Sequence, residues 1–109
     1  LTPDSPEWQR TDTFNQLGCL SAFEGDVVHA KACLGEVKLT QSQEWYCELL
    51  VACIARAEGD AEREAAALKR WWAGADASPV RVYAVAGNRW VLERLGAGGS
   101  AGVGDSARG

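Results

Sequence analysis

Four cysteines and one histidine are the residues of this sequence whose types can carry chemistry. They are Cys19, Cys33, Cys47, Cys53 and His29. No two cysteines have Cys-x-x-Cys spacing, and no cysteine–histidine pair has zinc-finger spacing, so we expect no metal site. His29 has no serine or cysteine at the spacing of a nucleophile motif, and no glycine-rich phosphate loop is present. We therefore expect no catalytic residue and no cofactor, and we predict that His29 lies on a helix surface.

The surroundings of the cysteines indicate packing rather than reactivity. Each cysteine lies among Ala, Leu and Val in a segment with a helical pattern. Cysteine in such a setting usually packs as a small apolar residue, with a disulfide or a reactive thiol as the alternative. Reduced cysteines are typical of the cytoplasm, and we expect a cytoplasmic protein.

The overall composition fits one folded domain. Of the 109 residues 47% are apolar and 24% charged, which is close to the globular average. The net charge is −4 and no basic block occurs, so we expect no nucleic-acid partner; no apolar run is long enough to span a membrane. The chain begins at Leu1 and has no methionine, which predicts a processed chain or a fragment. Residues 96–109 are mostly Gly, Ala and Ser, so we expect a domain over residues 1–95 and a flexible tail or linker after it.

Helices are the elements that the sequence predicts for positioning these residues. Asp26 is the expected N-cap of the second helix, and Thr40 or Ser42 that of the third. Gly74 is expected to end the fourth helix. Apolar periodicity and the turn residues together predict about five helices, over residues 6–23, 26–39, 42–58, 61–72 and 80–95.

The last of these segments fits two patterns. Read with a period of two, Val82 and Val85 flank a Gly87-Asn88 turn and predict a β-hairpin. Read with a helical period, its aromatic residues fall on one side of a helix. The Ser-Pro start before it and the Leu-Gly end after it favour the helix.

Two Gly-Asp pairs divide the chain into units of equal length. Gly25-Asp26 and Gly59-Asp60 lie 34 residues apart, and each pair follows a glutamate. Each pair also separates two helical segments, so each unit is a predicted helical hairpin. A period of 34 residues indicates a helical repeat protein.

The first unit carries a motif at matching spacing. A bulky residue, a Leu-Gly pair, a turn glycine and an Ala-x-x-x-Leu pair follow in order, at Phe14, Leu17, Gly18, Gly25, Ala30 and Leu34. In these residues the chain resembles the tetratricopeptide-repeat family. The resemblance implies an all-α fold of antiparallel hairpins stacked as a short array, with residues 80–95 as a capping helix.

The residue sizes agree with such a stack. Gly18 leaves a gap beside Leu17, and Ala30 fills that gap with minimal bulk, so two helices can approach closely. One hairpin cannot bury its own apolar face, so stacked units share a core. Two and a half units are near the minimum, which predicts a partner, a second subunit or a longer parent chain. Adjacent Trp71 and Trp72 point about 100° apart, so one is expected at an edge or both beneath the last helix.

The resemblance also implies a site for a partner. In the family the first helix of each hairpin lines a concave face, and the inward positions are the predicted contacts here: Asn15, Cys19, Phe23, Leu49, Cys53, Arg56, Tyr83 and Trp90. Such a lining is apolar and aromatic with one cation, which suits an amphipathic helix or an extended apolar peptide. It does not suit the carboxylate clamp of some family members. The alternative is that Phe23, Leu49, Tyr83 and Trp90 belong to the core, with the inward face closed by the fifth helix or by the tail.

The predicted function is therefore protein–protein interaction, as a scaffold, an adaptor or a small chaperone, and not catalysis. One alternative is a regulatory helical-repeat fragment of a larger signalling or transcription protein. Another is a helical bundle that binds a small apolar ligand. The sequence leaves open whether the chain forms a homo- or hetero-oligomer.

Overall fold

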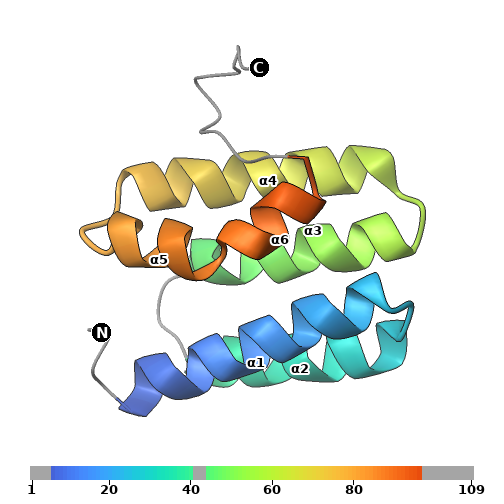
Figure 1. Cartoon of the computed structure of the whole chain (residues 1–109), viewed down its shortest axis with the longest axis horizontal. Helices are drawn as coiled ribbons and strands as arrows, with labels where there is room; N and C mark the ends of the chain where they lie inside the picture. The colour runs from blue at the N-terminus through green and yellow to red at the C-terminus, as the bar shows by residue number, and fades with distance from the viewer. Residues whose placement is uncertain (1–5, 41–43, 97–109) are drawn as a thin grey trace.

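Six α-helices and one short 3-10 helix make up the computed structural model, which describes residues 6–40 and 44–96 (Figure 1). The elements in order are α1 (Pro6–Phe23), α2 (Val27–Thr40), η1 (Glu44–Cys47), α3 (Glu48–Ala57), α4 (Ala61–Asp76), α5 (Arg81–Gly87) and α6 (Arg89–Arg94). The described part contains no strand, so the all-α prediction is confirmed. The predicted tail, apart from Gly96, lies outside the described residues, and so does Ser42.

Both Gly-Asp pairs form the same turn. Gly25 and Gly59 have φ angles of 85° and 77°, in the left-handed region that glycine adopts without a steric penalty. Asp26 and Asp60 then cap the next helix, because their Oδ1 atoms each accept a hydrogen bond of 3.1 Å from a backbone N–H three residues on. The repeat therefore recurs in backbone geometry as well as in sequence.

The two hairpins share one core. Helix α3 packs against both α1 and α2, and α4 packs against α3 (Figure 1). A Cβ atom added at Gly18 would lie 2.7 Å from Leu50 Cδ2 and 3.0 Å from Cys33 Cβ, so this glycine sets how closely α1 approaches its neighbours. The predicted close approach at Gly18 is confirmed, but the residues nearest to it are Leu50 and Cys33 rather than Ala30, and Leu17 is exposed.

Gly74 was expected to end the fourth helix, and this prediction is wrong. Helix α4 continues to Asp76, and Gly74 lies inside it. A Cβ atom at Gly74 would overlap the indole of Trp45. The glycine is therefore explained by the close approach of a side chain from η1 rather than by a helix end. The third helix also begins later than expected, because residues 44–47 form a 3-10 turn before α3 and Thr40 belongs to α2.

Residues 80–95 form neither a hairpin nor one continuous helix. Two short helices, α5 and α6, meet at Asn88, whose φ of −113° departs from helical values. The Asn88 Nδ2 group donates a 2.8 Å hydrogen bond to the Ala84 carbonyl, and its own N–H bonds to Val85. This local competition for backbone groups breaks the helix at Asn88.

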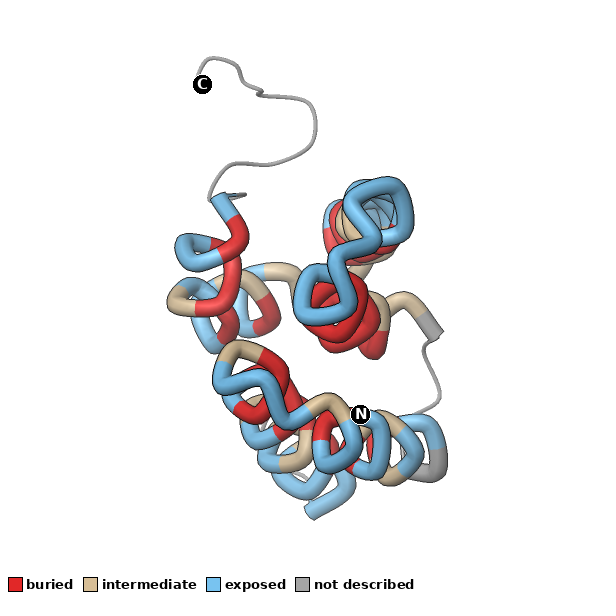
Figure 2. Tube along the Cα trace, turned by 90° about the vertical axis from the view of Figure 1, so that its right-hand side faces the viewer, coloured by how far each residue is buried: buried red, intermediate tan, exposed pale blue. Residues whose placement is uncertain are grey.

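Helices α5 and α6 lie in front of the α3–α4 hairpin in the view of Figure 1, with the α1–α2 hairpin below them. In the view turned by 90°, the buried parts of all three helix pairs face one another and the exposed parts face outward (Figure 2). Trp71 and Trp72 are both buried in this core, as are Leu92 and Leu95 from the last helix. No helix within the described ranges is long and apolar enough to cross a membrane.

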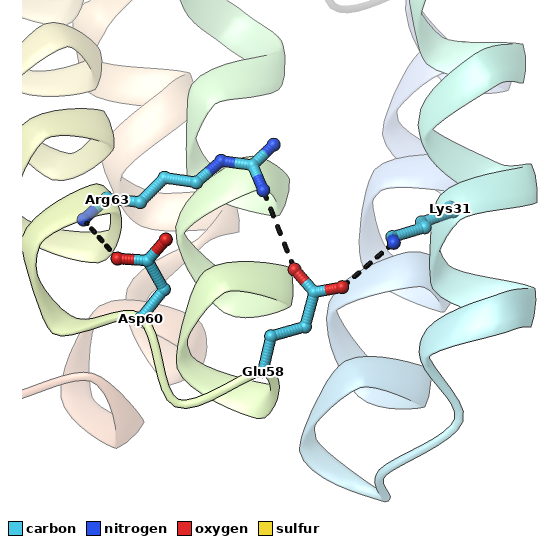
Figure 3. Close-up of polar contacts among 4 residues, drawn as sticks. All are labelled: Lys31, Glu58, Asp60 and Arg63. Atoms are coloured by element: carbon cyan, nitrogen blue, oxygen red, sulfur yellow. Dashed lines mark hydrogen bonds and ion pairs between the residues drawn. The ribbon is translucent and has the colours of Figure 1, made fainter.

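Charged side chains connect the hairpins at their Gly-Asp ends (Figure 3). Glu58 Oε2 lies 2.8 Å from Lys31 Nζ on α2, and Glu58 Oε1 lies 3.5 Å from Arg63 Nη1 on α4. These pairs are exposed, where an ion pair typically contributes about 0.2–1 kcal/mol. The Lys31–Glu58 pair joins the first hairpin to the second, whereas the Glu58–Arg63 pair lies within the second hairpin.

Candidate functional site

The eight side chains predicted to contact a partner occupy three environments. The first group is fully buried and comprises Asn15, Cys19, Leu49 and Cys53. The second group is partly buried and comprises Phe23 and Trp90, and the third is exposed and comprises Arg56 and Tyr83. In this conformation only the second and third groups present surface to another molecule.

Three of the eight side chains form a single stripe on α1, while Leu49 and Cys53 are buried on α3. Asn15, Cys19 and Phe23 are spaced four residues apart and so share one helix face. Asn15 Nδ2 donates a 2.8 Å hydrogen bond to Asn88 Oδ1, and the Phe23 ring lies 5.9 Å from the Trp90 ring. Both ends of the stripe thus contact the α5–α6 segment, and Cys19, between them, hydrogen-bonds with Cys53 on α3. The face predicted to be concave is covered by the chain's own last helices.

Asn88 is the polar centre of this contact. Its Oδ1 atom accepts hydrogen bonds from Asn15 Nδ2 and, at 3.0 Å, from Gln16 Nε2. Asn15 and Asn88 are both completely buried, yet Asn15 Oδ1 has no hydrogen-bond partner. A buried polar atom without a partner destabilises a fold by about 1–3 kcal/mol. The contact is therefore specific but carries an energetic penalty.

The contact of α1 with α5–α6 is centred on the pair formed by Asn15 and Asn88. Gln16 extends it along α1 by its hydrogen bonds to Asn88 and to the Gly87 carbonyl. We call this contact the seam.

Beside the seam lies a group of larger side chains that we call the aromatic patch, made up of Leu20, Phe23, Tyr83, Trp90 and Arg94. The Phe23 and Trp90 rings meet edge to face, with an interplanar angle of 61°. The Arg94 guanidinium carbon lies 5.3 Å from the centre of the Phe23 ring and 5.9 Å from that of Trp90. Such cation–π contacts contribute about 0.5–1 kcal/mol each at exposed sites and hold the rings in place.

Gln16 joins the two sides of the patch. Its Oε1 atom accepts a hydrogen bond from Trp90 Nε1, and its Nε2 atom donates one of 3.1 Å to the Gly87 carbonyl. Leu20 lies one turn after Gln16 on α1, and Tyr83 lies one turn before Gly87 on α5. Leu20 is 41% exposed and Tyr83 57% exposed, so apolar surface remains open on either side of Gln16.

Arg56, the one cation among the predicted contacts, does not join the patch. Its Nη1 atom lies 3.5 Å from Glu64 Oε2, so the side chain pairs across α3 and α4. Sequence reasoning missed Arg94, which supplies the cation instead. The signal was present, because Arg94 follows Trp90 by one helical turn.

The four thiols are buried, and the pKa is raised for two of them, Cys19 and Cys33. A hydrogen bond with Cys53 and burial raise the pKa of Cys19 well above its ordinary value. Burial, together with Glu36 and Asp26, raises the pKa of Cys33. None of the four cysteines forms a disulfide, and all four are buried, as predicted. A thiol with a raised pKa is a poor nucleophile at neutral pH.

His29 makes contacts that the sequence pattern did not reveal. Its Nδ1 atom lies 2.6 Å from Ser21 Oγ, and its Nε2 atom lies 3.8 Å from Cys33 Sγ. Ser21 and His29 stand at equal distances from Gly25, so the hairpin geometry was the available signal. With the neutral Cys33 as its neighbour, His29 joins α1 to α2 rather than activating a thiol. The described residues contain no group of three His, Cys, Asp or Glu side chains that could hold a metal ion.

Comparison with protein-family models, with curated proteins and with solved structures finds no match to this chain.

Proposed function

We propose that the protein is a protein-interaction module that binds an amphipathic helix or an extended apolar peptide of another protein at the aromatic patch. The observation that carries the proposal is the ordered set of Phe23, Trp90 and Arg94 beside the exposed side chains of Leu20 and Tyr83. The partner's own role would decide whether the module serves as a scaffold, an adaptor or a small chaperone.

The side chains of the patch are of the types that dominate binding energy. Trp, Tyr and Arg are enriched among the residues whose truncation weakens an interface most. Trp90 is held by Gln16 and Arg94, so its side chain loses little conformational freedom when a partner covers it. The adjoining Leu20 and Tyr83 supply apolar area that suits one face of a helix.

The proposed architecture is a short tetratricopeptide-like stack with α1 and α3 as the first helices of its two hairpins. The repeated Gly-Asp turn and the close approach at Gly18 support it. In this reading α5 and α6 lie where a peptide would lie in a longer array, and the aromatic patch forms along their edge.

Two matched substitutions test the proposal. Leu20→Asp places a charge in the patch, while Val28→Asp places one at an 83% exposed aliphatic position on α2, outside the patch. The full-length protein and both variants are immobilised and exposed to an extract of the cells that produce the protein. Bound proteins are then quantified by mass spectrometry.

We expect one protein to be retained by the unmodified chain and by Val28→Asp, and its retention to fall at least about tenfold with Leu20→Asp. Circular dichroism confirms that each variant is folded. Equal retention by the two variants would contradict the proposed surface.

A further inference from the structure

We infer that α5–α6 is a hinged cover over α1, latched by Asn88, and that closing the latch assembles the aromatic patch. The role of the patch as a binding site rests on the proposed function, while the cover and its latch do not. The inference concerns the regulation of the proposed site.

The patch is divided between the cover and the body of the protein. Leu20 and Phe23 belong to α1, whereas Tyr83, Trp90 and Arg94 belong to α5 and α6. The contacts that join the two sides, from Gln16 to Trp90 and from Phe23 to Arg94, exist only when the cover lies on α1. Lifting the cover would therefore dismantle the patch.

The α5–α6 cover has few interactions that hold it to the rest of the protein. Helices α5 and α6 have seven and six residues, which is too short for either to be stable without packing against the rest of the chain. Its large buried apolar side chains are Val91, Leu92 and Leu95. The connection to α4, residues 77–80, contains no buried residue. A segment attached in this way opens more readily than the two hairpins.

The latch, which is the hydrogen-bonded pair of Asn15 and Asn88, is polar, although an apolar contact at this buried position would stabilise the closed cover more. Asn15 and Asn88 are fully buried, and Asn15 Oδ1 is left without a partner. Replacing a buried polar pair by apolar residues of similar volume is often neutral or stabilising, whereas removing one partner alone is destabilising. The pair therefore fixes the position of the cover while limiting how firmly it closes.

Two cysteines report separately on the cover and on the body. Cys19 lies between Asn15 and Phe23 on the stripe that the cover contacts at both ends. Cys33 lies at the contact of α1 with α2, close to Gly18 and His29. Because Cys19 also hydrogen-bonds with Cys53 on α3, we expect opening of the cover to increase its exposure in part and to leave Cys33 protected, whereas global unfolding exposes both fully.

The test measures labelling of each cysteine in the folded, full-length protein with N-ethylmaleimide, resolved by peptide mass spectrometry. With Asn88→Ala, which leaves Asn15 without its partner, we expect the ratio of Cys19 to Cys33 labelling rates to rise about tenfold or more. With the double change Asn15→Leu and Asn88→Leu, we expect that ratio to fall below the value of the unmodified chain. An unchanged ratio in either variant overturns the inference. If Asn88→Ala fails to fold, the double variant decides alone.

The same variants separate the cover from the proposed function. In the extract assay, Asn88→Ala should lose the retained protein and the double variant should keep it. If Cys19 labelling responds as expected but retention does not, the hinged cover is supported and its role in assembling the binding patch is contradicted. If retention depends on Leu20 but the ratio of Cys19 to Cys33 labelling does not change in the Asn88 variants, the proposed function is supported and the hinged cover is contradicted.

Discussion

Replacing Gly18 by alanine tests whether the two hairpins meet as described. The new Cβ atom would lie 2.7 and 2.8 Å from the two terminal carbons of Leu50, and 3.0 Å from Cys33 Cβ. Leu50 is fully buried, so its side chain cannot avoid the new Cβ atom by rotating toward solvent. Overpacking of this kind destabilises a core by about 1–3 kcal/mol, while alanine gains about 1 kcal/mol over glycine in helix propensity. We expect a net loss of about 1 kcal/mol in the free energy of unfolding.

Gly35 provides the matched control, because a Cβ atom there would meet nothing within 4 Å on the exposed face of α2. Gly35→Ala should therefore gain about 0.5–1 kcal/mol from propensity and reduced chain entropy. Urea denaturation of both variants measures the free energies, and the two melting temperatures should shift in opposite directions by several degrees. If Gly18→Ala were stabilised as much as Gly35→Ala, the close approach of α1 to Leu50 would be refuted.

Two further predictions concern the turns and the response to pH. Asp26→Ala and Asp60→Ala should each lower the free energy of unfolding by about 1 kcal/mol, because each removes a helix cap. Asp26→Asn should change it little, since asparagine can still cap the helix. Equal losses with Ala and Asn at position 26 in urea denaturation would argue against capping. Burial and the neighbouring Asp12 raise the pKa of Tyr46, and a hydrogen bond and burial raise that of Cys19, so the unfolded chain loses these protons first. The free energy of unfolding should thus fall as the pH rises above about 9, which thermal melts at several pH values would follow. Tyr46→Phe should make this fall less steep above about pH 10. An unchanged dependence of the melting temperature on pH in this variant would contradict a raised Tyr46 pKa.

The features that the sequence predicted correctly depend on local chemistry. The Gly-Asp turns need only a residue that tolerates positive φ and a short acidic side chain after it, and both are readable from neighbouring residues. Gly18 was also identified, because small residues in an apolar helix stripe indicate close approach. The all-α class followed from the period of the apolar residues.

The features that the sequence did not reveal depend on contacts between distant residues. Asn88 was read as part of a possible hairpin turn, whereas its role comes from Asn15 and Gln16, which are 73 and 72 residues away. Gly74 was read as a helix end because its neighbour Trp45 lies in another element. The sequence left open whether the last helix closes the inward face of α1, because that closure depends on Asn88 and Trp90 meeting residues more than 65 positions away.

Position-specific photo-crosslinking tests the central claim, that this protein binds another protein at the aromatic patch, most directly. A photoreactive phenylalanine analogue replaces the 57% exposed Tyr83, and a second chain carries it at Val28 as a control. After illumination in the producing cells, we predict one discrete covalent adduct from position 83, lost when Leu20→Asp is added, and none from position 28. Adducts of equal yield from both positions, or none from position 83, would contradict the claim.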